Sequence, residues 1–190
     1  MTDRISRIVA DSIDAKARFF AEFGGEVERA AGVISDSLKS GGKLLVFGNG
    51  GSAADAQHIA GELVNRFLQE RRALPAISLT TDGGVLTCIA NDTGFERVFA
   101  RQVEALGNAG DVCLAISTSG QSPNIVAACE QARGQGIKVI GLLGRDGGRV
   151  AALCDLALIV QSNDTQRIQE THNLVGHILC ELIETEMFSQ

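Results

Sequence analysis

The sequence predicts an α/β fold, with a five-stranded parallel sheet flanked by helices on both faces. Short apolar runs that are typical of buried parallel strands alternate with longer segments of helical periodicity. The connections between them are short and rich in glycine, of which the chain has 22 among its 190 residues. A hydrophobic content of 45% supports one well-packed core, so we expect residues 1–190 to form a single domain.

Two helices are expected before the first strand. Residues 3–22 and 25–40 both have helical patterning, and an apolar stripe runs along the first of them: Ile5, Ile8, Val9, Ile13 and Phe19 or Phe20. The pair Gly41-Gly42 ends the second segment. We therefore predict an N-terminal helical hairpin over residues 1–40, followed by an α/β core over residues 41–190.

The core alternates strands and helices along the chain. The predicted strands are the apolar runs at residues 43–47, 74–79, 111–116, 137–142 and 156–160. The predicted helices lie at residues 52–67, from a turn at 82–84 to about Ala90, and at 95–106, 123–134 and 167–187. Parallel strands end at one edge of a sheet, and such sheets bind their ligands there.

The loop after the first strand contains a tight turn and a polar helix face. The turn is permitted by three glycines, Gly48, Gly50 and Gly51. Ser52 is predicted to be the N-cap of the next helix, whose free backbone N–H groups favour an anion such as phosphate. His58 and Glu62 stand four residues apart and share a helix face. They are candidates for an acid/base or metal-binding pair, unless they form only a solvated surface pair.

The loop after the third strand is the better candidate for binding phosphate. Residues 117–122 contain Ser117, Thr118, Ser119 and Ser122, and Pro123 follows at a predicted first helical turn. Hydroxyls and backbone N–H groups can hold a phosphate without a lysine. Residues 49–52 would then shape another part of the same pocket.

Several classes of protein are disfavoured. The chain has no Walker pattern, and its glycines do not complete a dinucleotide-binding fingerprint. A net charge of −6 argues against direct contact with nucleic acid. No apolar run reaches the length of a membrane span, and the N-terminus lacks a signal-peptide pattern. We expect a cytoplasmic protein whose five scattered cysteines are small buried core residues: Cys88, Cys113, Cys129, Cys154 and Cys180.

The last predicted helix carries a second polar row. Gln169, Asn173 and His177 recur at every fourth position, opposite the apolar side of the helix. His172 lies closer to the apolar edge, so we interpret it as a structural residue. His177 can be read either as a packed structural histidine or as a functional one.

These motifs in combination resemble those of the sugar-isomerase (SIS) domain family, through residues 47–58, 91–92, 116–122 and 167–170. More narrowly, the chain resembles the bacterial phosphoheptose isomerases, which interconvert sedoheptulose 7-phosphate and D-glycero-D-manno-heptose 7-phosphate. The similarity runs essentially along the whole chain. It implies a flavodoxin-like three-layer sandwich and an aldose–ketose isomerase of bacterial heptose and lipopolysaccharide precursor biosynthesis.

The resemblance also implies which residues form the site. The residues implied to contact the sugar phosphate are Asn49, Gly50, Gly51, Ser52, Glu62, Asn91, Asp92, Ser117, Thr118, Ser119, Ser122 and Gln169. Glu62 and His177 are the implied acid/base residues. Some members bind zinc at positions that match His58, Glu62, Gln169 and His177. Some members also have a catalytic aspartate where this chain has Gln166, so that role is not carried over.

These residue types fit the chemistry of isomerisation through an enediol(ate). One group must move a proton between C1 and C2, and another must serve the two oxygens. Glu62 is expected to act at carbon and His177 at the oxygens, while a zinc ion could polarise the carbonyl group. If zinc binds Glu62, this carboxylate is less available as a base, so the division of roles between the two residues stays open.

Geometry predicts an oligomer. Gln169 and His177 are separated by about 12 Å of helix rise at ~1.5 Å per residue, so they meet one metal only at nearly full reach or from different chains. The face that carries His58 and Glu62 points away from its own sheet, and we expect a partner subunit to cover it. By resemblance, the assembly is a homotetramer that uses residues 1–40, with active sites at subunit interfaces.

Two alternatives to an enzyme are open. Another branch of the family associates with a DNA replication initiator, and the chain resembles it at residues 65–67, 74–77 and 109–112. The presence of both Glu62 and His177 favours the enzyme. A non-catalytic sensor of sugar phosphates is the third reading, and we expect no attached DNA-binding segment.

Overall fold

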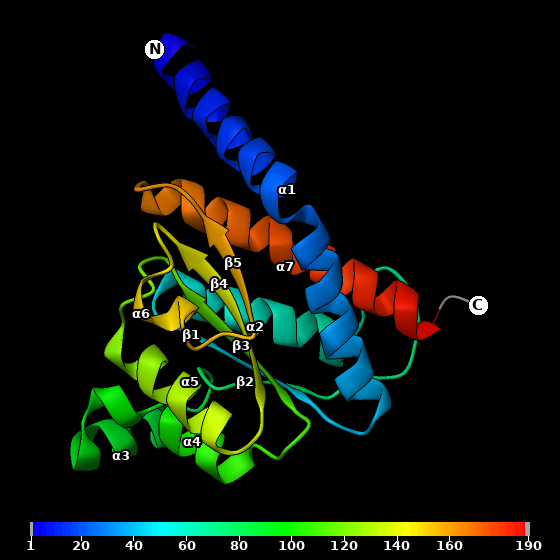
Figure 1. Cartoon of the computed structure of the whole chain (residues 1–190), viewed down its shortest axis with the longest axis vertical. Helices are drawn as coiled ribbons and strands as arrows, with labels where there is room; N and C mark the ends of the chain where they lie inside the picture. The colour runs from blue at the N-terminus through cyan, green and yellow to red at the C-terminus, as the bar shows by residue number, and fades with distance from the viewer. Residues whose placement is uncertain (1, 189–190) are drawn as a thin grey trace.

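The structure is a computed structural model that describes residues 2–188 (Figure 1), so residues 1, 189 and 190 of the predicted domain lie outside it. Five strands form one sheet: β1 (Leu44–Gly48), β2 (Ala76–Ser78), β3 (Val112–Ser117), β4 (Lys138–Gly144) and β5 (Leu156–Val160). Neighbouring strands all pair in parallel, in the order β2-β1-β3-β4-β5. The predicted five-stranded parallel sheet is confirmed.

Helices cover both faces of this sheet. One face is covered by α1 (Thr2–Lys39), α2 (Gly51–Val64) and α7 (Thr165–Phe188). The other side holds α3 (Gly83–Thr93), the 3-10 helix η1 (Phe95–Arg97), α4 (Ala100–Leu106), α5 (Pro123–Gly134) and α6 (Gly148–Ala151). No helix within residues 2–188 is long and apolar enough to cross a lipid bilayer.

The burial of β1 on both faces explains why its apolar run is continuous. Leu44 and Val46 pack in the core under α1, α2 and α7. Leu45 and Phe47 pack in the core on the opposite face. All four side chains are at most 1% exposed. A strand buried in this way shows no polar alternation, which is typical of a central parallel strand.

The order in which strands are added to the sheet changes direction at β1. It passes from β1 outward to β2 and then returns past β1 to β3. After β1 the chain enters α2 on one face, whereas after β3 it enters α5 on the other. Open α/β sheets bind ligands in the crevice that such a divergence leaves at the carboxyl ends of the strands. The two polar loops predicted from the sequence lie at this point.

The predicted N-terminal hairpin is wrong, because α1 is one continuous helix of 38 residues. Gly24 and Gly25 lie inside it, and neither has the positive φ that would turn the chain. Each glycine costs a helix about 1 kcal/mol relative to alanine. Phe19, Phe23 and Val27 lie on both sides of the glycine pair and pack against the same core, which offsets this cost.

Three smaller elements also differ from the sequence prediction. β2 is shorter than residues 74–79, because Pro75 has no N–H for the strand ladder and β2 is an edge strand. The helix predicted at 95–106 is divided into η1 and α4, with the buried Val98 and Phe99 between them. No pattern predicted α6, whose four residues are too few for a helical period.

Three of the cysteines meet the expectation of burial, one meets it in part and one does not. Cys113, Cys129 and Cys180 are buried and Cys154 is partly buried. Burial raises the pKa of the Cys113 and Cys154 thiols to about 12. Cys88 is exposed, because α3, the helix that carries it, buries none of its residues. All five thiols are free.

His172 is a structural residue, as predicted. It is 1% exposed, and its Nε2 lies 3.0 Å from the carbonyl oxygen of Leu143, near the end of β4. Its Nδ1 is buried without a hydrogen-bond partner. Burial lowers the pKa of His172 from 6.5 to about 4, against a smaller opposing effect of the bond to Leu143. The ring therefore links α7 to the sheet in its neutral form.

Acidification from pH 6.5 to about pH 4 is expected to destabilise the fold through His172. The unfolded chain binds a proton at this ring in that window and the folded chain does not, so stability falls as the pH falls. Urea unfolding at a series of pH values measures the slope. The His172→Gln variant keeps an amide that can bond Leu143 and is expected to lose this part of the slope. Equal slopes in the two proteins would contradict the assignment.

Candidate active site

The loop from β1 to α2 is a tight turn built on glycine. Gly50 is the N-cap of α2 and has a φ of 58°, a conformation that favours glycine. A Cβ on Gly48 would lie 2.7 Å from the carbonyl oxygen of Ser52. The prediction that Ser52 is the N-cap is wrong, because the turn at Gly50 lets the helix begin at Gly51. Ser52 lies inside the first turn and is 3% exposed.

Asn49 joins this loop to the start of α5. Its Nδ2 donates to Oδ1 of Asn124 at 2.9 Å, and Nδ2 of Asn124 donates back to Oδ1 of Asn49 at 2.8 Å. Asn124 is 2% exposed, so the pair is fixed inside the crevice. Sequence reasoning missed Asn124. Its position in the first turn after Pro123, beside the hydroxyl-rich loop, is the signal that could have identified it.

The loop after β3, residues 118–122, is held in shape before any ligand arrives. Ser117, at the end of β3, accepts a hydrogen bond from the backbone N–H of Gly120 at 3.0 Å. Gly120 has a φ of 62°, and a Cβ there would collide with the carbonyl group of Gly147, in the loop after β4. The N–H of Val150 donates to the carbonyl oxygen of Gly120 at 3.0 Å. The loops after β3 and β4 are therefore locked together.

Two hydroxyls of this loop are available to a ligand. The side chains of Thr118 and Ser122 have no hydrogen-bond partner within the described part of the chain. Ser119 Oγ accepts a hydrogen bond from the N–H of Gln121 at 3.2 Å. Ser122 is the N-cap of α5 and Pro123 is its first residue, as predicted. Free hydroxyls at a helix N-terminus are suited to an anion.

A polar hollow of about 430 Å³ opens beside this loop. It is lined by Ser119, Gln121, Arg145, Asp146, Gln161, Ser162 and Asn163, which belong to the loops after β3, β4 and β5. Arg145 has a φ of 60° and is the one non-glycine residue with positive φ within residues 2–188. The loops after β4 and β5 contain no recognisable anion motif, so this hollow could not be predicted from the sequence.

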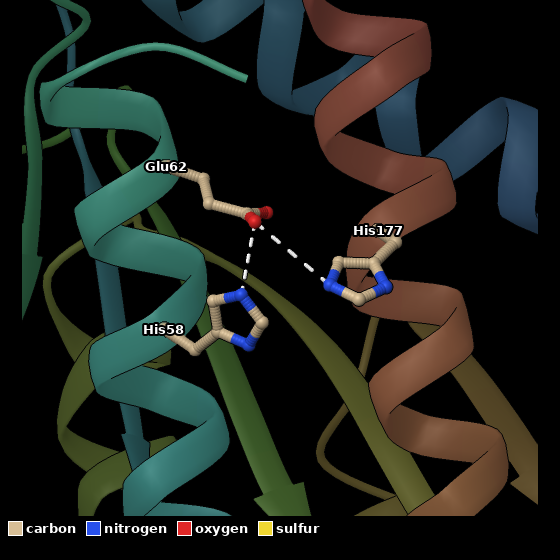
Figure 2. A group of neighbouring side chains, drawn as sticks. All are labelled: His58, Glu62 and His177. Atoms are coloured by element: carbon tan, nitrogen blue, oxygen red, sulfur yellow. Dashed lines mark hydrogen bonds and ion pairs between the residues drawn. The ribbon is translucent and has the colours of Figure 1, made fainter. Parts of the chain in front are cut away.

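His58, Glu62 and His177 form a compact cluster between α2 and α7 (Figure 2). Oε1 of Glu62 lies 2.9 Å from Nε2 of His58 and 3.8 Å from Nε2 of His177. One ligand atom from each residue lies within 4.8 Å of the other two. Figure 2 shows both imidazoles directed at the same carboxylate. The structure therefore brings together three of the four residues that the resemblance implies for zinc.

Aromatic contacts fix the two imidazole rings. The rings of His58 and His177 meet edge to face, with centroids 4.9 Å apart and an interplanar angle of 83°. Phe67, in the segment after α2, stacks on His177 with centroids 5.8 Å apart. Such contacts restrict the orientation of a side chain that would otherwise rotate freely.

The two oxygens of the Glu62 carboxylate have different environments. Its side chain is 18% exposed, and Oε2 is buried with no hydrogen-bond partner of ordinary geometry. The pKa of the buried Cys180 thiol is raised, mainly by burial and to a smaller extent by the nearby negative charge of Glu62. Burial also raises the pKa of Asp55, against a hydrogen bond from Asn173. A buried acceptor without a donor is suited to a cation or to a substrate hydroxyl.

α7 of the same chain lies against the face of α2 that carries His58 and Glu62, but it leaves 43% of the His58 side chain exposed. The expectation that a partner subunit covers this face therefore stays a prediction. A Cβ on Gly176 would lie 3.0 Å from the side chain of Ile59, so glycine at this position lets the two helices pack closely. Sequence periodicity identified both polar faces but not their contact, because periodicity carries no information on which helices are neighbours.

Other implied site residues lie apart from this cluster. Gln169 lies against the start of α2, where a Cβ on Gly51 would be 2.5 Å from its Nε2. Gln169 and His177 both lie on α7, about two helical turns apart. Asn91 and Asp92 are exposed on α3 and bond each other at 2.8 Å. Gln166, in the first turn of α7, is also exposed and makes no contact with the cluster.

Comparisons with known proteins agree with this architecture. The family model described as the SIS domain matches residues 9–144. A phosphoheptose isomerase of Pelobacter propionicus is 58% identical over 159 residues, 84% of each chain. One of Trichlorobacter lovleyi is 52% identical and covers 99% of this chain and 96% of its own.

Solved structures agree as well. The phosphoheptose isomerase of Neisseria gonorrhoeae superposes with a TM-score of 0.92 at 43% identity. The match covers 97% of this chain and 98% of that one. The similarity thus extends through the sheet, both polar loops and the helices that carry the cluster. The chain belongs to the SIS-domain family and, within it, to the phosphoheptose isomerases.

Proposed function

We propose that the chain is an aldose–ketose isomerase that interconverts sedoheptulose 7-phosphate and D-glycero-D-manno-heptose 7-phosphate. The observation that carries this proposal is the meeting of Glu62 and His177, with Oε1 and Nε2 3.8 Å apart, beside a sheet edge with two loops suited to an anion. A carboxylate and an imidazole side by side can serve carbon and oxygen atoms of one substrate. A binding protein for a replication initiator would need neither group.

The substrate is oriented by its phosphate. The phosphate binds at the N-terminus of α5 and to the hydroxyls of Thr118, Ser119 and Ser122, which are free to donate hydrogen bonds. Residues 49–52 contact the sugar chain. In the reaction, Glu62 removes a proton from C1 of the ketose and returns it to C2. His177 protonates the oxygen on C2 and accepts the proton of the oxygen on C1.

A zinc ion fits the cluster. Two imidazole nitrogens and a carboxylate oxygen are ordinary zinc ligands, and the orphaned Oε2 of Glu62 lacks a partner that a cation would supply. His58, Glu62 and His177 would hold the ion, with Gln169 of a neighbouring subunit as the fourth ligand. Any atom of Glu62 or His177 that binds the metal would be less available for proton transfer, so the division of roles given above applies to atoms that the metal leaves free. Bound there, zinc would act as a Lewis acid on the substrate carbonyl group.

The assembly that we propose is a cytoplasmic homotetramer with active sites at subunit interfaces. It is supported by an exposed apolar stripe on the part of α1 that projects from the body of the molecule: Ile5, Ile8, Val9 and Ile13. The distance of Gln169 and of Asn91 and Asp92 from the cluster also favours completion of the site by another chain. Five free thiols suit a reducing compartment, and the heptose product would serve lipopolysaccharide synthesis.

Turnover of sedoheptulose 7-phosphate is expected to depend on both acid/base residues. Glu62→Gln and His177→Gln are each expected to lower kcat by about 10²–10⁴-fold, because each removes a proton-transfer group. A coupled assay for the aldose product measures the loss. Glu130→Gln, a matched change at an exposed position of α5, serves as the control and should keep full activity. Undiminished activity in both site variants, or an inactive wild type that binds a replication initiator, would overturn the proposal.

Purified protein is expected to contain about one zinc ion per chain. His58→Ala and His177→Ala should lower the zinc content measured by mass spectrometry, whereas His172→Gln should leave it unchanged. Removal of zinc by a chelator should lower the thermal midpoint, since a metal that binds only the folded state stabilises it. Equal zinc content in all these proteins would refute the assigned ligands.

Substitution of the exposed stripe is expected to dissociate the tetramer. The double variant Ile8→Ser/Ile13→Ser removes apolar surface without disturbing the core, so the chain should fold but elute as a smaller species with little activity. Light scattering after gel filtration measures the mass. Asp11→Ser, an exposed change on the same helix, is the control. A fully active monomer would show that the site is complete within one chain.

A further inference from the structure

The C-terminal end of α2 is capped by a side chain from outside the helix. The last carbonyl groups of a helix have no partner within it. Here Arg71 Nη2 donates to the carbonyl oxygen of Glu62 at 2.8 Å, and Nη1 donates to those of Leu63 at 2.8 Å and Asn65 at 3.2 Å. The guanidinium group thus binds the backbone of the proposed catalytic residue itself.

Glu184 of α7 holds this guanidinium group and the chain segment before it. Oε1 of Glu184 accepts from Nε of Arg71 at 2.9 Å and from the N–H of Phe67 at 3.2 Å. Oε2 accepts from the N–H groups of Leu68 at 2.7 Å and Gln69 at 3.0 Å. Both oxygens are therefore satisfied by donors from residues 67–71, the irregular segment that follows α2.

The ion pair is deeply buried, with side-chain exposures of 3% for Arg71 and 1% for Glu184. Burial alone would raise the pKa of Glu184. Hydrogen bonds from the backbone of Leu68, Phe67 and Gln69 and from Arg71 outweigh it and hold the pKa below its ordinary value. Each nitrogen of the guanidinium group and each oxygen of the carboxylate has a hydrogen-bond partner, and a buried network satisfied in this way holds the elements that it joins in place.

Both members of the acid/base pair are attached to this ion pair. Glu62 is attached through its own carbonyl group, which Arg71 binds. His177 is attached through Phe67, whose ring stacks on the imidazole and whose N–H is bound by Glu184. Glu184 also lies on the same helix as His177, about two turns further along. The pair therefore links α2, the segment after it and α7 around the cluster.

We propose that Arg71 and Glu184 are positioning residues for isomerisation, which set the distance and orientation between the Glu62 carboxylate and the His177 imidazole. They touch no substrate atom and act through the α2 backbone and the Phe67 ring. This inference rests on the proposed roles of Glu62 and His177. Proton transfer is sensitive to such placement, because a displacement of about 1 Å can cost roughly 10²-fold in rate.

A second, partly buried ion pair, with side-chain exposures of 20% for Lys43 and 3% for Asp111, allows the positioning role to be separated from a purely structural one. Lys43 Nζ donates to Oδ2 of Asp111 at 2.7 Å, and the N–H of Lys43 donates to Oδ1 at 2.9 Å. Asp111 also accepts from the N–H of Asn108. Like the Arg71–Glu184 pair, it joins a cation to a carboxylate that also accepts backbone N–H groups. Lys43 and Asp111 directly precede β1 and β3, so this pair lies where the strands begin, at the end of the sheet opposite the ligand loops.

The test compares Glu184→Gln, Arg71→Lys and Asp111→Asn by steady-state kinetics at a temperature at which circular dichroism reports each protein as folded. Glu184→Gln and Arg71→Lys are expected to lower kcat by about 10–100-fold with little change in KM, since phosphate binding is untouched. Asp111→Asn should lower the thermal midpoint and keep the wild-type kcat. Arg71→Lys keeps the charge opposite Glu184, so it folds even if Glu184→Gln does not.

The imidazole signals supply a readout that does not depend on turnover. The chain has three histidines, so the proton and carbon resonances of labelled His58, His172 and His177 can be distinguished by single substitutions. Glu184→Gln should shift the His177 signal, because the Phe67 ring moves, and leave His172 unchanged. Arg71→Lys should lower kcat with a smaller shift, because Glu184 still binds Phe67.

Wild-type kcat and an unshifted His177 signal in folded Glu184→Gln and Arg71→Lys would overturn the inference. An equal loss of kcat in Asp111→Asn would also overturn it, because the Arg71–Glu184 pair would then contribute only to the stability of the fold. Failure of the proposed function gives a different pattern, in which Glu62→Gln and His177→Gln stay active while the His177 signal still responds to Glu184→Gln.

Discussion

The close packing of α2 on α7 is the contact on which the site depends. Gly176 permits it by leaving room for Ile59, and the next residue, His177, then faces Glu62. Neither helix carries a complete set of functional groups. The sheet fixes the starting point of α2, and the buried ring of His172 attaches α7 to β4. The proposed chemistry therefore depends on the interface between two helices that are distant in sequence.

The site divides into a binding half and a reacting half. The proposed binding half lies in loops at the carboxyl ends of the strands, where glycine turns and free hydroxyls are suited to an anion. The reacting half lies along two helices on one face of the sheet, where imidazoles and a carboxylate are partly shielded from water. A long, open-chain sugar phosphate suits such a division, because its phosphate and its carbonyl group are at opposite ends of the molecule.

Most of the fold could be predicted from the sequence, because strand runs, glycine turns and helical periods are local signals. The two ligand loops and the candidates Glu62 and His177 followed from the same signals and from the family resemblance. The continuous α1 could not be predicted, since tertiary packing outweighs Gly24 and Gly25. The Arg71–Glu184 pair could not be predicted either. The two residues are 113 positions apart, and in a sequence an arginine and a glutamate are most simply interpreted as exposed surface residues.

The lock between Gly120 and Gly147 has a thermodynamic consequence. The loop proposed to bind phosphate is already held by Ser117 and by the backbone of Val150, so little loop entropy would be lost when a ligand binds. The entropy lost on binding then falls mainly on the substrate, whose flexible carbon chain must straighten between two fixed ends. A short sugar phosphate would gain the same phosphate contacts without reaching the helices. With the proposed roles of this loop and of the helix cluster, the rigid loop would make the length of the carbon chain, measured from the phosphate, the quantity by which this protein selects its substrate.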